Sequence, residues 1–158
     1  MYARSFARGR TFALVVPSVF AMVVMGHQAL ASAQRTTGVV IEDTGAAVGG
    51  APAAAALDGA LHEALDAQPG LRLEGRASRA RYVITGSIVE WNTREVSDGH
   101  EFRCGVSIVV ADSHGSVRAM LSGRAAARGE GDVGSLSARA LLAATRSALR
   151  PLADGGLN

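Results

Sequence analysis

The pattern that most restricts the fold is a pair of alternating segments separated by a turn. Every second residue from Phe102 to Val110 is apolar, and Arg103 and Ser107 occupy positions between them. Residues 117–127 alternate in the same way with the opposite parity. A period of two is typical of a β-strand with one buried face. Asp112-Ser113-His114-Gly115, between the segments, has the composition of a tight turn, so we predict an antiparallel hairpin.

The alternation also predicts a register for this hairpin. Residues opposite each other share a face, so a turn centred on Ser113 and His114 pairs Ile108 with Ala119 and Cys104 with Gly123. On the outer face the same register places Arg103 opposite Arg124. Like charges directly opposite each other are destabilising unless an anion lies between them. We therefore expect an anionic ligand or partner near this pair.

Two helices are expected on either side of the strands. Leu57, Leu61 and Leu65 recur every four residues and predict a helix over residues 54–67. A second helix is expected over residues 135–149, with Ser135 as its N-cap and Pro151 ending it.

Further strands are expected over residues 71–73 and 81–91. The order of elements predicts an α+β fold, in which an antiparallel sheet of three to five strands carries two helices packed on one face.

The N-terminal residues resemble a secretory signal peptide. Three arginines precede an apolar run at residues 11–25, and Ala31-Ser32-Ala33 is a small-residue cleavage site. We expect residues 1–33 to be removed. Before cleavage, this leader is expected to be the only part of the protein that contacts the membrane. An uncleaved membrane anchor is the alternative. Residues 34–53 are expected to be a flexible linker that could include an edge strand, residues 54–153 a single α+β domain, and residues 154–158 a tail.

Removal of this leader would change the charge of the protein. The chain has 16 basic and 14 acidic residues, and three arginines lie in residues 1–33, so 13 basic residues remain and the net charge becomes −1. We therefore do not expect the domain to bind nucleic acid through an overall basic surface. Cys104 is the single cysteine of the chain, so no internal disulfide can form. On the apolar side of its strand, it is expected to pack as a small hydrophobe, with a nucleophile or an intersubunit bridge as alternatives.

No catalytic, metal or cofactor site is expected. Gly129 to Gly134 match G-x-G-x-x-G, but the parallel strand that a dinucleotide fold requires does not follow. His100 and His114 lie near opposite ends of one strand, and His62 lies on the first helix, so no shared metal site is expected. Asp112, Ser113 and His114 are adjacent, whereas a catalytic triad converges from separate segments.

The outer face of the sheet is the candidate binding surface. Arg103, Arg118 and Arg124 fall on it by parity, as does Trp91 if its strand keeps the same alternation. Arginine beside tryptophan and apolar residues is typical of protein interfaces. Two other interpretations are a solvated face and a face covered by residues 34–53.

Three segments carry a family resemblance. Ala80 to Ile88, which includes Tyr82-Val83-Ile84-Thr85-Gly86, resembles a strand of several bacterial envelope domains, and Val110 to Val117 resembles the hairpin that follows it. Leu57 to Leu73 resembles the helix that precedes that strand. These domains occur in the amino-terminal part of the Tol translocation protein, in the curli-secretion lipoprotein and in penicillin-binding-protein activators. The chain departs from them at Gly75 to Ala80, which is too short for their second helix.

The resemblance implies a periplasmic or secreted, non-enzymatic envelope module. Together with the outer face, it predicts binding to an envelope protein or an anionic envelope polymer. A small extracytoplasmic enzyme with an unrecognised site and a structural homodimer formed through the sheet are the alternatives.

Overall fold

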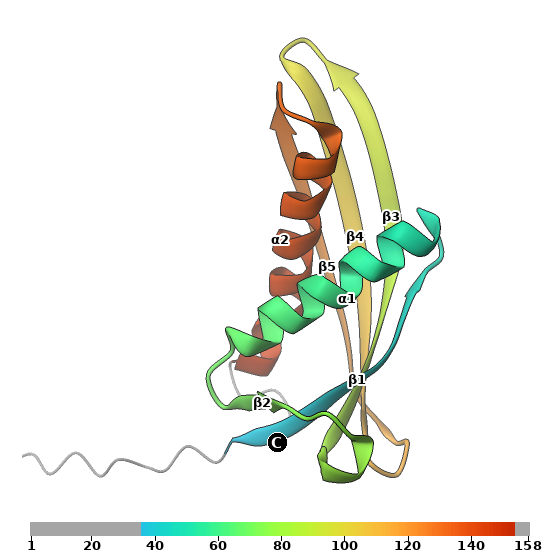
Figure 1. Ribbon diagram of the computed structural model, residues 1–158, viewed down its shortest axis with the longest axis vertical. Helices are drawn as coiled ribbons and strands as arrows, with labels where there is room; N and C mark the ends of the chain where they lie inside the picture. The colour runs from blue at the N-terminus through green and yellow to red at the C-terminus, as the bar shows by residue number, and fades with distance from the viewer. Residues whose placement is uncertain (1–35, 154–158) are drawn as a thin grey trace, which may run out of the picture. The chain divides into compact units, whose positions relative to one another are not determined.

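A computed structural model describes residues 36–153 of the 158-residue chain (Figure 1). The predicted signal peptide, its cleavage site and the predicted tail lie outside the described residues. The described elements, in chain order, are β1 (Thr37–Ala46), α1 (Gly50–Asp66), β2 (Leu71–Leu73), the 3₁₀ turn η1 (Ala77–Arg79), β3 (Tyr82–Val96), β4 (Gly99–Asp112), β5 (Val117–Gly129) and α2 (Val133–Ala153).

The five described strands form one mixed sheet in the order β2-β1-β3-β4-β5. Strands β3, β4 and β5 are antiparallel neighbours, as the alternating pattern predicts. Strand β1 runs parallel to both β2 and β3, so the expectation of an antiparallel sheet is wrong. The cause is α1, which returns the chain from the end of β1 to the start of β2 and so makes these two strands parallel. The α+β class with two helices is confirmed.

The segment that was expected to be a linker contributes to the sheet. Strand β1 lies between β2 and β3 instead of at an edge, and Val39 is fully buried. The Gly- and Ala-rich residues that follow it form the connection into α1, which begins at Gly50. Gly49 has a φ of 90°, a conformation that glycine adopts without strain, and it turns the chain over Trp91.

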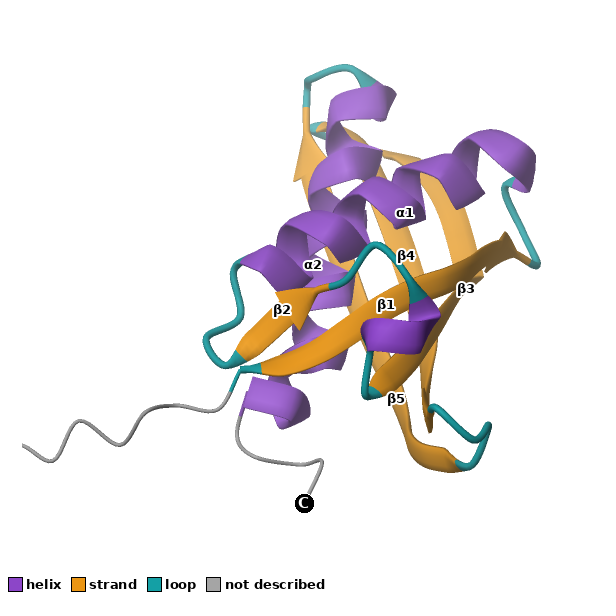
Figure 2. Ribbon diagram, turned by 60° about the horizontal axis from the view of Figure 1, so that its bottom comes forward, coloured by secondary structure: helices purple, strands orange, loops and turns teal. Residues whose placement is uncertain are grey.

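Both helices pack on the same face of the sheet, here called the inner face (Figures 1 and 2). Helix α1 contacts β1 and β3, and α2 contacts β4 and β5. The even-numbered residues of β4 from Phe102 to Val110 point into this core and are at most 1% exposed. The opposite, outer face carries no helix in the described part of the chain.

Two glycines let the helices approach the sheet closely. A Cβ at Gly86 would lie 2.8 Å from Leu61 of α1. A Cβ at Gly123 would overlap the carbonyl oxygen of Ala144 and lie 2.7 Å from the amide nitrogen of Ala148, so the backbone of α2 rests directly on β5. A glycine inside a strand is typical of such close approach.

Helix α2 begins and ends beyond its expected bounds. The backbone N–H of Ser135 donates to Asp132 Oδ2 at 3.0 Å, so Asp132 and not Ser135 caps the helix. Pro151 lies inside the last turn instead of ending the helix. The helix continues past Pro151 because Leu152, like Leu149, is buried against the core.

The register of the β4–β5 hairpin differs from the expected one by two residues. Cys104 lies opposite Ala125, Arg103 opposite Ala126, and Arg124 opposite Gly105. The expected pairing of Arg103 with Arg124 is therefore wrong. Half of this shift lies in the turn, where the N–H of Asp112 donates to the carbonyl oxygen of Ser116 across three residues. The other half is a bulge, because Ala111 pairs with Val117 but Val110 pairs with Ala119, which leaves Arg118 as an extra residue in β5.

We predict that Gly123→Ala destabilises the protein by about 3 kcal/mol, because the added methyl group would push α2 away from β5. Gly59→Ala is the matched control. Gly59 is exposed on α1 with nothing within 4 Å of an added Cβ, so this change should stabilise the helix by about 0.5–1 kcal/mol. Urea unfolding of both variants measures the difference. Equal stabilities of the two variants would show that α2 does not depend on close contact at Gly123.

Candidate binding surface on the outer face of the sheet

The outer face of β3, β4 and β5 changes character along the strands. Near the β4–β5 turn it is largely apolar, and Met120 is 75% exposed. A row of three serines crosses the middle of the sheet. Beyond the serines lie three rows that carry the charged residues, and the first two of these rows also include a small residue. In order across β3, β4 and β5 these rows are Glu90-Gly105-Arg124, Asn92-Arg103-Ala126 and Arg94-Glu101-Arg128, preceded by Ser87-Ser107-Ser122.

Glu101 is the centre of the last row. Its side chain is only 2% exposed, although it lies on the outer face, because three arginines cover it. Arg94 Nη2 lies 2.8 Å and Arg103 Nε 2.7 Å from Oε1, and Arg128 donates to Oε2. The hydrogen bond from Arg94, with those from Arg103 and Arg128, lowers the pKa of the Glu101 carboxyl to about 2. Glu101 is therefore ionised at neutral pH and joins β3, β4 and β5.

Arg124 has a looser environment. Its Nε lies 3.7 Å from Glu90 Oε2, too far for a hydrogen bond, and its side chain is 81% exposed. Gly105 lies between these two residues in the register, and the side chains of Glu90 and Val89 pack over it. A hollow of about 290 Å³ lies beside it, lined by Glu90, Arg103, Cys104, Arg124, Ala125 and Ala126.

We refer to Arg94, Arg103, Arg124 and Arg128, together with Glu90 and Glu101, as the arginine cluster. Four positive charges against two negative ones give it a net charge of +2. Each of the four arginine side chains is at least half exposed. The cluster can therefore attract an anionic group from solvent.

Trp91 lies on the inner face, contrary to the parity argument. The extra residue Val89 forms a bulge between Ile88 and Glu90, after which the alternation of β3 is inverted. The Trp91 ring packs edge-on against Phe102, with ring centroids 4.7 Å apart. Trp91 is thus part of the packing beneath the start of α1, and it does not join the arginines.

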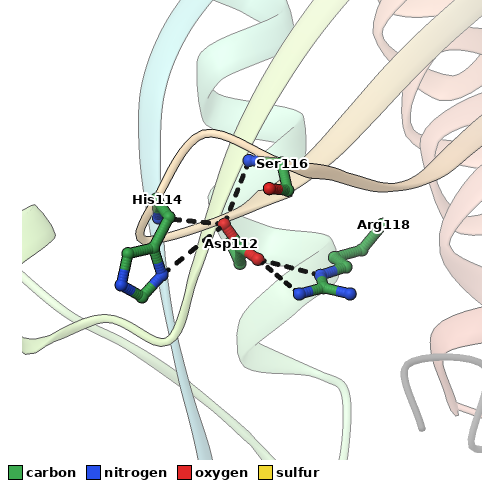
Figure 3. A network of polar contacts seen from close by, with 4 residues as sticks. All are labelled: Asp112, His114, Ser116 and Arg118. Atoms are coloured by element: carbon green, nitrogen blue, oxygen red, sulfur yellow. Dashed lines mark hydrogen bonds and ion pairs between the residues drawn. The ribbon is translucent and has the colours of Figure 1, made fainter.

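Arg118 lies at the start of β5, beside the β4–β5 turn, where it contacts Asp112 (Figure 3). Its Nε and Nη2 donate to Asp112 Oδ2 at 2.9 and 2.6 Å, and the backbone N–H groups of His114 and Ser116 donate to Oδ1. The hydrogen bond from Ser116, followed by that from Arg118, lowers the pKa of Asp112. The Asp-Ser-His run therefore forms a turn closed by Asp112, as the sequence predicts.

Of the four residues predicted to form the binding surface, the structure thus brings together Arg103 and Arg124. The sequence reasoning missed Arg94, Glu90 and Glu101. The odd number of Glu101 is a usable signal, because it continues the outer-face alternation of β4 by one step. Arg94 and Glu90 follow the Val89 bulge and carry no such signal.

Two observations on the described residues concern metal ligands and the single cysteine. No group of three or more His, Cys, Asp or Glu side chains among residues 36–153 could hold a metal ion. The Cys104 side chain is 1% exposed, and burial raises the pKa of its thiol to about 11. A protonated, buried thiol is a poor nucleophile. In the described segment, neither helix has the combined length and apolar character needed to cross a membrane.

Comparison with known proteins relates the chain to bacterial proteins of the same fold. A PelC dodecamer from Paraburkholderia phytofirmans is 19% identical, with a TM-score of 0.58 over 75% of this chain and 90% of that chain. Protein XCC0632 from Xanthomonas campestris is 13% identical, with a TM-score of 0.53 over 77% and 83%. Hypothetical protein CT253 from Chlamydia trachomatis is 14% identical, with a TM-score of 0.51 over 76% and 92%.

At these low identities, the TM-scores above 0.5 show a shared fold and nothing beyond it. No protein-family model matches the chain, and a search of curated proteins found no match.

We predict that Glu101 makes the stability of the protein depend on pH in the acid range. Its pKa is lower in the folded state than the ordinary value of 4.5, so its contribution is complete above about pH 4.5 and is lost as the pH falls towards 2. Glu101→Gln should lower the melting temperature at pH 7 and remove this part of the acid dependence. Thermal unfolding between pH 2 and 7 measures both effects.

Glu63→Gln is the control, because Glu63 pairs with a single arginine, Arg146, and both side chains are more than half exposed. It should change the melting temperature little. If the wild type and Glu101→Gln lose stability in parallel on acidification, Glu101 is not the ionised centre of the cluster.

Proposed function

We propose that this protein is an exported, non-enzymatic module of the bacterial envelope, which binds another envelope component through the outer face of its sheet. The observation that carries the proposal is the asymmetry of the sheet. Two helices cover the inner face, whereas the outer face bears the exposed arginine cluster. A charged, uncovered face opposite a complete hydrophobic core is available for binding without loss of packing.

The shared fold supports the envelope assignment. PelC and XCC0632 cover three quarters or more of this chain with TM-scores above 0.5. The sequence resemblance to the Tol, curli-secretion and penicillin-binding-protein-activator domains is a second reason for proposing an envelope module, because these are also bacterial envelope domains. The net charge of +2 on the cluster indicates an anionic partner, either an acidic protein surface or an anionic envelope polymer.

We predict that Arg103→Gln combined with Arg124→Gln weakens capture of envelope components about 10-fold at low salt, equivalent to about 1.4 kcal/mol. Capture by the wild type should itself weaken as salt rises. Immobilised protein incubated with envelope extracts, followed by quantitative mass spectrometry, measures the effect. Arg139→Gln with Arg150→Gln is the matched control, because it removes the same charge from exposed positions on α2.

Equal capture by the wild type and the outer-face double variant at low salt would refute the proposal. Arg124→Gln alone should give part of the effect. It leaves all three arginines on Glu101 in place, so it separates lost binding from a loosened sheet.

Export is the second part of the proposal. We predict that the protein recovered from the periplasm or medium begins at or near Gln34, because the leader ends in the small-residue site at Ala31 to Ala33. Intact-mass measurement of the secreted form and of the membrane fraction tests this. Intact Met1 in the membrane fraction would show that the leader is retained as an anchor.

A homo-oligomer is a second candidate, favoured by the description of PelC as a dodecamer. Strand β5, which is 13 residues long, lies at an edge of the described sheet and offers backbone groups for pairing. Light scattering of the wild type and of the Arg103/Arg124 double variant distinguishes the candidates. A mass that falls with the double variant would place the arginine cluster between subunits.

A further inference from the structure

We infer that the hollow beside Ala126 binds a phosphate monoester whose carrier bears a free hydroxyl, held between the guanidinium groups of Arg103 and Arg124. This inference rests on the proposed function and names the chemistry that the surface recognises.

The register places the two arginines on opposite corners of one hollow. Arg124 lies opposite Gly105, and Arg103, two residues from Gly105, lies opposite Ala126. Diagonal neighbours of this kind are about 7–8 Å apart. Two long side chains at this spacing can therefore both contact a single group that lies between them. Of the other two corners, Ala126 is small and leaves the space open, whereas the side chains of Glu90 and Val89 cover Gly105. A volume of about 290 Å³ suits one small group.

The hydrogen-bonding capacity of both arginines is largely unused. Arg103 contacts Glu101 through Nε alone, and half of its side chain is exposed. Arg124 reaches Glu90 only at 3.7 Å. Two guanidinium groups can therefore turn their terminal nitrogens towards a ligand in the hollow. Planar guanidinium groups bind phosphate and carboxylate oxygens in pairs.

The charge and the number of acceptor atoms favour phosphate over carboxylate. A phosphate monoester carries close to two negative charges at pH 7 and offers three acceptor oxygens. It would neutralise the net charge of +2 on the cluster, whereas a carboxylate would leave half of that charge. Ser107 and Ser122 lie one row further along the sheet and line a separate hollow, which shares only Arg124 with this one.

Glu90 is the reason why the ligand should carry a free hydroxyl beside its phosphate. Its carboxylate lines the hollow and would repel a bare phosphate ion. A carboxylate accepts hydrogen bonds, so a ligand that presents a hydroxyl beside its phosphate gains a partner there. Glycerol phosphates and sugar phosphates have this combination, either free in solution or as part of a larger envelope molecule.

The test is a titration followed by the Nε–H signals of the arginine side chains in nitrogen–proton correlation spectra, at constant ionic strength. Glycerol 3-phosphate should shift the Arg103 and Arg124 signals to saturation and bind more tightly than inorganic phosphate. Sedimentation with vesicles that contain lysophosphatidic acid, a phosphate monoester with one free glycerol hydroxyl, supplies the lipid arm of the experiment. If the protein binds the vesicles but not glycerol 3-phosphate, the phosphate group belongs to a lipid. The reverse result identifies a free phosphate monoester in solution.

Three variants define the site. Arg124→Gln should weaken binding about 10-fold. Glu90→Gln should strengthen inorganic phosphate binding and abolish the preference for glycerol 3-phosphate. Ala126→Leu should block the hollow without changing its charge, while Ala143→Leu, at an exposed position on α2, should have no effect. Unchanged melting temperatures show that the variants are folded.

Shifts that do not saturate, or binding by Ala126→Leu equal to that of the wild type, would overturn the inference. If phosphate fails to bind but envelope capture still depends on Arg103 and Arg124, the proposed function stands with a different partner. If capture is also independent of these arginines, both fail.

Discussion

Two β-bulges decide which side chains reach the outer face of this sheet. The bulge at Val89 inverts the alternation of β3, so Trp91 enters the core and Glu90 lies over Gly105, at the edge of the hollow. The bulge beside the β4–β5 turn shifts β5 along β4 by one residue, so Arg124 lies opposite Gly105 on the outer face. Without the first bulge Trp91 would be exposed, and without the second Arg124 would lie opposite Cys104 and point into the core. The arginine cluster depends on both.

The class of the fold was predictable because it follows from local patterns. The four-residue period of Leu57, Leu61 and Leu65, and the alternation from Phe102 to Val110, reflect burial on one side, which any packing of these elements has to satisfy. Strand β1 was not predictable as an interior strand. Its central position depends on pairing with β2 and β3, which are distant in sequence, and a Gly- and Ala-rich context gives no local sign of such pairing.

The candidate site was predictable only in part, for the same physical reason. Parity places Arg103 and Arg124 on the outer face correctly, because both lie on the regular parts of their strands. It fails for Trp91 beyond a bulge, because one additional residue exchanges the two faces for every residue that follows. It also does not reveal that Arg118 is engaged by Asp112 in the turn, since that contact depends on the geometry of the turn itself.

The inner face of the sheet provides the packing that stabilises the protein, and the outer face provides the proposed binding surface. Glu101 contributes to both. The core is built from aliphatic side chains beneath α1 and α2, so most outer-face residues can change without disturbing it. Glu101 differs because it holds arginines from both β3 and β5, and through Arg103 it also orients one wall of the hollow. A ligand that draws Arg103 towards the hollow competes with Glu101 for that guanidinium. Binding at Arg103 should therefore be coupled to the order of the three strands, whereas binding at Arg124 should not.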